Sequence, residues 1–104
     1  MNALIVGADR IEPIRQELER HSESLGIRRC LHWSGRHVGD SRRQVPGDTR
    51  VIVMICDRLS HQLLNNVRKQ AQKLGVPVIY ARHSLVEVRE KLEALRQPGA
   101  VLVH

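Results

Sequence analysis

The feature that most constrains the fold is a regular alternation of short apolar runs with segments of helical periodicity. Continuous apolar runs occur at 3–6, 51–56 and 100–103, and 76–80 is similar, with a proline near its start. Buried strands of a parallel sheet read as such runs, and helices then cover the sheet. This alternation predicts an α/β fold, and 104 residues predict one domain, 1–104.

Three segments between these runs have the apolar spacing of amphipathic helices. Glu12, three residues after Asp9, completes a capping-box pattern, and Pro13 is tolerated only in a first helical turn. A polar N-cap residue stands at each predicted start, and a glycine follows two of the predicted ends. The first helix should begin near residues 9 to 12 and end at Gly26. The second should begin at Ser60 and end at Gly75, and the third should begin at Ser84.

Residues 27–33 have polar side chains on both faces, which indicates an edge strand. The segment 34–50 should be mainly loop, with at most a short helix around 41–45. Numbered along the chain, the strands should form a flavodoxin-like, Rossmann-like parallel sheet of order 2-1-3-4-5.

Right-handed crossovers in that order place the first helix on one sheet face and the later helices on the other. The pattern is truncated after strand five, so no helix follows to complete the first face. We therefore expect a homodimer that buries the sheet face covered only by the first helix.

Polar residues gather where the predicted strands end. Because parallel strands end at one edge of the sheet, ligands bind there. Helix capping accounts for some of these residues, but it does not account for the several histidines among them. The predicted ligand-binding residues are Asp9, Arg10, His32, Arg36, His37, Asp57, Ser60, His61, Arg82, His83 and Ser84.

Arginines beside helix N-termini suit an anionic or phosphorylated molecule, which makes a small-ligand-binding or regulatory module the first hypothesis. A small enzyme that uses His61 with Asp57 is an alternative. The sequence has no dinucleotide fingerprint or phosphate-binding loop, so the cofactor stays unassigned. No tight metal-ligand spacing is present, and we assign no metal site.

The net charge of +6 is concentrated in the middle of the chain, where residues 28–73 carry most of the arginines and lysines. This basic segment makes a nucleic-acid-associated accessory protein a further alternative. Only Trp33 and Tyr80 are available to stack on bases, which counts against that alternative. An ordinary basic protein without an anionic partner explains the composition equally well.

No apolar run approaches the roughly 20 residues needed to span a bilayer. The N-terminal residues lack the basic region of a secretory signal. We therefore expect a cytoplasmic protein without a membrane partner, in which Cys30 and Cys56 are reduced core residues.

Short motifs at the predicted loops give the chain a family likeness. It resembles a bacterial family of domains of unknown function, number 2325, and the match spans nearly the whole chain. The resemblance implies the α/β fold and the loop site, but no activity. The motifs are Gly7-x-Asp9-Arg10, His32-x-x-Gly35-Arg36, Asp40-Ser41-Arg42-Arg43, Ser60-His61, Lys73-Leu74-Gly75-x-Pro77 and Ser84-Leu85.

Overall fold

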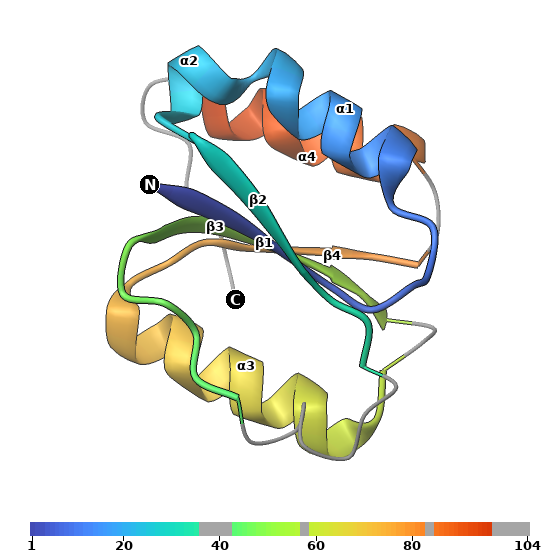
Figure 1. Cartoon of the computed structure of the whole chain (residues 1–104), viewed down its shortest axis with the longest axis vertical. Coiled ribbons are helices and arrows are strands. Elements are labelled where there is room, and N and C mark those ends of the chain that lie inside the picture. The colour runs from blue at the N-terminus through green and yellow to red at the C-terminus, as the bar shows by residue number, and fades with distance from the viewer. Residues whose placement is uncertain (36–42, 57–58, 83–84, 97–104) are drawn as a thin grey trace.

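The computed structural model describes residues 1–35, 43–56, 59–82 and 85–96, with the side chain of residue 96 excepted. Strands and helices alternate along the chain (Figure 1). In chain order they are β1 (Asn2–Val6), α1 (Glu12–Arg20), α2 (Ser22–Leu25), β2 (Arg29–Trp33), β3 (Thr49–Ile55), α3 (His61–Leu74), β4 (Val78–Ala81) and α4 (Leu85–Arg96).

The strands form one parallel sheet in the order β2-β1-β3-β4. The α/β class, the parallel sheet and the edge position of β2 are confirmed. The sheet has four strands where we expected five, and the predicted fifth strand at 100–103 lies outside the described residues.

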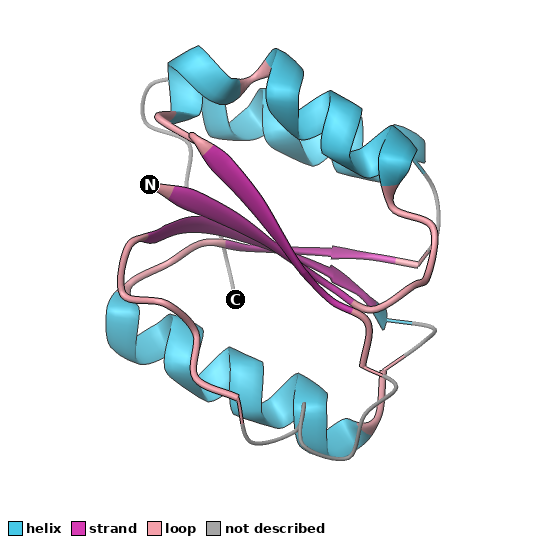
Figure 2. Cartoon of the chain, in the orientation of Figure 1, coloured by secondary structure: helices cyan, strands magenta, loops and turns pink. Residues whose placement is uncertain are grey.

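Helices cover both faces of the sheet (Figures 1 and 2). Side chains of α1 and α4 pack on one face, and side chains of α3 pack on the other. The prediction that every helix after the first lies opposite it is therefore wrong for α4, which packs beside α1. The expected strand order makes α4 a crossover to a further strand, whereas in the structure α4 covers the part of the face that α1 leaves open, over Ile79 and Ala81.

This position of α4 removes the apolar face through which we expected a dimer to form. Among the described residues, the large hydrophobic side chains that are exposed are those of Met1, Leu74 and Val86, and none of these lies in a strand. The sheet face covered only by the first helix is thus absent, and the homodimer itself stays a prediction.

Local signals set most helix ends. The side chain of Ser60 accepts a hydrogen bond from the Leu63 backbone N–H, and Gly75 ends α3 in a left-handed conformation. The first predicted helix is divided, because α1 ends at Arg20 and Gly26 ends the short helix α2. The capping box at Asp9 is wrong, because α1 begins two residues later with Ile11 as its N-cap and no side-chain cap. Gly7 and Ala8 both have positive φ angles, so the chain leaves β1 through a turn that delays the helix.

The described part of the segment after β2 runs along α3 without regular structure. Gln70 holds it, since its side chain donates to the Arg43 carbonyl over 2.8 Å and accepts from the Val45 N–H over 2.6 Å. The short helix expected around 41–45 does not include 43–45, and 41–42 lie outside the described residues. Within the described ranges, no helix combines the length and apolar character needed to cross a membrane.

Candidate functional site

The strand register brings the chain segments that follow the strands to one edge of the sheet. Val6, the last residue of β1, is level with Trp33 of β2 and with Met54 of β3. Ile55, the last residue of β3, is level with Ala81, the last of β4. We call this side, where residues 7–10, 34–35, 56 and 82 follow the strands, the carboxyl edge.

The turn after β1 is built around Gly7. Its N–H donates to the Trp33 carbonyl over 2.7 Å, which ties the turn to the end of β2. A Cβ atom at this position would lie 2.8 Å from the Ile55 carbonyl oxygen, and φ is +98°. Ala8 follows with φ of 63°, which is an uncommon conformation for a residue with a side chain. Only glycine fits this approach between β1 and β3 without a shift.

His32 holds the same turn from β2. Its Nε2 atom lies 3.1 Å from the Gly7 carbonyl oxygen and 2.8 Å from that of Ala8. Carbonyl oxygens only accept hydrogen bonds, so Nε2 carries the hydrogen and donates. The half-buried His32 therefore positions the turn, and its predicted contact with a ligand stays a prediction.

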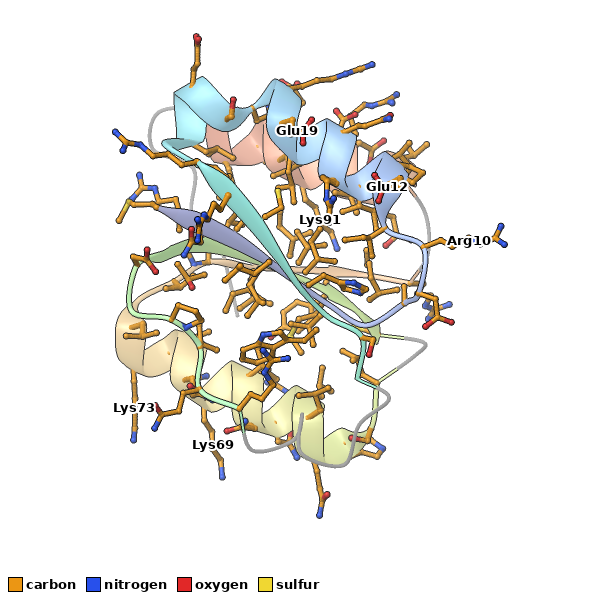
Figure 3. The ribbon with its side chains drawn as sticks, in the orientation of Figure 1. Arg10, Glu12, Glu19, Lys69, Lys73 and Lys91 are labelled. Atoms are coloured by element: carbon orange, nitrogen blue, oxygen red, sulfur yellow. The ribbon has the colours of Figure 1, made fainter. Side chains whose placement is uncertain are left out.

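Asp9 and Arg10 follow this turn and are exposed, and the Arg10 side chain extends away from the ribbon (Figure 3). Arg82 is exposed directly after β4. Ser60 and His61 are exposed at the N-terminus of α3, where the first N–H groups of a helix have no partner inside it. The Ser60 hydroxyl already accepts the Leu63 N–H over 3.2 Å.

Of the predicted ligand-binding residues, Asp9, Arg10, His32, Ser60, His61 and Arg82 thus lie along the carboxyl edge or directly beside it. The others fall outside the described residues: Arg36, His37, Asp57, His83 and Ser84. In the described ranges, no group of three or more His, Cys, Asp or Glu side chains is arranged to hold a metal ion.

The described arginines and lysines of the basic segment lie in several separate parts of the molecule. Arg28 and Arg29 lie at the opposite end of β2 from the carboxyl edge, and Arg50 lies at the start of β3, where its Nε donates to the Leu25 carbonyl. Lys69 and Lys73 belong to α3, on the other side of the sheet from α1.

Sequence reasoning missed a buried polar cluster between α1 and α4. A Glu17 carboxylate oxygen lies 3.3 Å from the Arg89 Nε and 3.6 Å from the His21 Nε2, which is also 3.6 Å from a Glu93 oxygen. Glu17 and His21 are only 4% and 3% exposed. Their spacing was the available signal, because with Ile14 and Leu18 they complete one helical stripe.

Comparison with known proteins identifies a protein family for this chain. Residues 2–95 match the family model described as "Uncharacterized protein conserved in bacteria (DUF2325)". No curated protein and no solved structure matches the chain.

Proposed function

The chain belongs to DUF2325, a family of uncharacterized proteins conserved in bacteria, and we propose that it is a binding module for an anionic, phosphorylated small molecule at its carboxyl edge. One observation carries the proposal. The parallel register gathers Asp9 and Arg10, Ser60 and His61, and Arg82 from three separate strand ends along one side of the sheet.

Two features of this edge favour an anion. The N-terminus of α3, a helix of 14 residues, presents N–H groups that have no partner inside the helix and the positive end of the helix dipole. Arg10 and Arg82 supply exposed guanidinium groups, which match the geometry of phosphate oxygens. The Gly7–Ala8 turn adds strained backbone of the kind that clusters at functional sites.

Ligand-induced stabilisation tests the proposal. Inorganic phosphate and nucleoside monophosphates should raise the melting temperature of the protein, because a ligand at about 100 times its Kd stabilises by roughly 2.7 kcal/mol. His61→Ala with Arg82→Ala should abolish this rise and leave the unliganded melting temperature nearly unchanged. Arg28→Ala with Arg29→Ala, at the opposite edge, is the matched control and should keep it. The proposal would be contradicted if phosphate raised the melting temperature of the two double variants by the same amount.

The accompanying predictions have separate tests. A homodimer predicts a sedimentation mass of twice 11.9 kDa at micromolar concentration, and a mass of one chain would refute it. Fractionation of bacterial cells tests the cytoplasmic location.

The alternative of a small enzyme rests on His61 and Asp57. His61 is exposed and Asp57 lies outside the described residues, so no observation favours this alternative.

A further inference from the structure

Among the helices, acidic side chains are confined to one of the two layers. All seven glutamates of the chain lie on α1, α2 and α4. By contrast α3 carries Arg68, Lys69 and Lys73 and no acidic residue. Figure 3 shows Lys69 and Lys73 pointing away from the sheet on one side of the molecule, whereas Glu12 and Glu19 lie on the α1 side.

The outward face of α3 is unusual for a solvated helix. Apart from Leu74 at its last position, its exposed side chains are imidazole, amide or cationic: His61, Gln62, Asn65, Arg68, Lys69, Gln72 and Lys73. Lys69 and Lys73 are neighbours one helical turn apart, where like charges disfavour the helix. Among the described residues neither has an ion pair, whereas Arg15, Arg20 and Arg89 on the other layer each pair with a glutamate.

A fixed groove adjoins this face. The Asn66 side chain and the Gln70 side chain both donate to the Arg43 carbonyl, which fastens residues 43–45 beside α3. The Arg43 guanidinium lies over the Trp33 ring, 4.7 Å from its centroid. The groove has a volume of about 420 Å³, and the described residues that line it include one charged side chain, that of Lys73: Gln44, Val45, Asn66, Gln70, Lys73 and Leu74.

We propose that the outward face of α3 binds the phosphodiester backbone of double-stranded nucleic acid without regard to sequence. The 14 residues of α3 extend for about 21 Å, so its cations and amides can follow several phosphates. Such side chains are the usual partners of phosphate and sugar oxygens. No Phe, Tyr or Trp belongs to α3, which favours backbone contact over stacking on bases.

This surface shares His61 with the proposed anion site, but its cations are not part of that site, so the two proposals can fail separately. The α3 cations lie toward its C-terminal half, whereas the anion site uses residues at its N-terminus. Replacing Lys69 and Lys73 should leave phosphate-induced stabilisation intact, and replacing His61 and Arg82 should leave most duplex binding intact.

Fluorescence anisotropy of the full chain with a labelled DNA duplex of mixed sequence tests the surface. Contacts to about three phosphates predict that log K falls with log salt with a slope near −3. Lys69→Glu with Lys73→Glu should weaken binding at least tenfold. Arg28→Glu with Arg29→Glu makes the same change in net charge on exposed residues and should weaken it no more than threefold.

Further arms make every outcome decisive. Circular dichroism and thermal melting should show that both pairs of glutamate variants stay folded. Lys69→Arg with Lys73→Arg keeps both positive charges and should retain duplex binding. Absence of binding to duplex DNA and duplex RNA at about 20 mM salt would overturn the proposal. Equal losses of duplex affinity in the Lys69/Lys73 and Arg28/Arg29 glutamate variants would also overturn the proposal. Much tighter binding of single strands than of duplex would overturn it as well.

Discussion

At the scale of single residues, Gly7 fixes the turn that follows β1 at the carboxyl edge. It combines a positive φ angle with a close approach to the Ile55 carbonyl, so both backbone strain and a steric clash oppose a side chain there. Gly26 has a positive φ angle but open space around its Cα, and Gly47 has neither constraint. Alanine substitutions at these three glycines therefore separate the effect of backbone strain from the effect of a steric clash.

We expect alanine substitutions at these glycines to destabilise the protein in the order Gly7, Gly26, Gly47. Gly7→Ala should cost roughly 2–3 kcal/mol, because strain and clash add. Gly26→Ala should cost about 1 kcal/mol from strain alone, and Gly47→Ala should lie within about 0.5 kcal/mol of the parent. Chemical denaturation measures all three, and a Gly7→Ala variant as stable as Gly47→Ala would refute the geometry of the turn.

Burial raises the pKa of the Cys30 thiol, and this effect together with Glu19 outweighs the opposing influence of Arg15. The thiol ionises at lower pH in the unfolded chain, so unfolding releases a proton at pH values between the two pKa values. Stability should therefore fall as pH rises through that window. In a Cys56→Ser variant, the rate of Cys30 alkylation against pH should give a pKa above that of a free thiol. A pKa at or below the free value would contradict this environment.

At the scale of elements, local chemistry decided which boundaries could be predicted. The ends of α3 follow from Ser60 and Gly75, because a cap residue and a left-handed glycine act within one turn of the chain. The start of α1 could not be predicted from Asp9, since the preceding turn depends on packing against β3 and on His32. The face chosen by α4 likewise depends on what α1 leaves uncovered.

The contact between α1 and α4 depends on Glu17, whose side chain is 5% exposed between Arg89 and His21. Glu17→Ala should destabilise the protein by roughly 2 kcal/mol, because it removes a buried carboxylate and leaves the buried His21 with only the half-exposed Glu93 carboxylate nearby. Glu12→Ala is the control, since its side chain is 70% exposed beside Arg15, and it should cost less than about 1 kcal/mol. Thermal denaturation compares the two, and equal costs would refute the role of the cluster.

At the scale of the whole molecule, the parallel sheet explains how much of the candidate site the sequence could reveal. Strand direction alone brings Arg10, Ser60 and Arg82 to one edge, so their shared location was predictable from the βα alternation. The use of His32 to hold the Gly7–Ala8 turn was not predictable, because it depends on side-chain direction across two strands. The opposite charges of the two helical layers required knowledge of where α4 lies.

The most direct test of the account is a titration of ¹⁵N-labelled protein with inorganic phosphate, followed residue by residue in ¹H–¹⁵N spectra. Sodium chloride at equal ionic strength serves as the control. We predict that phosphate, and not chloride, shifts the amide signals of Gly7, Arg10, Ser60, His61 and Arg82 along one saturable curve. Shifts confined to the opposite edge, near Arg28 and Arg50, or shifts that chloride reproduces, would contradict a phosphate site at the carboxyl edge.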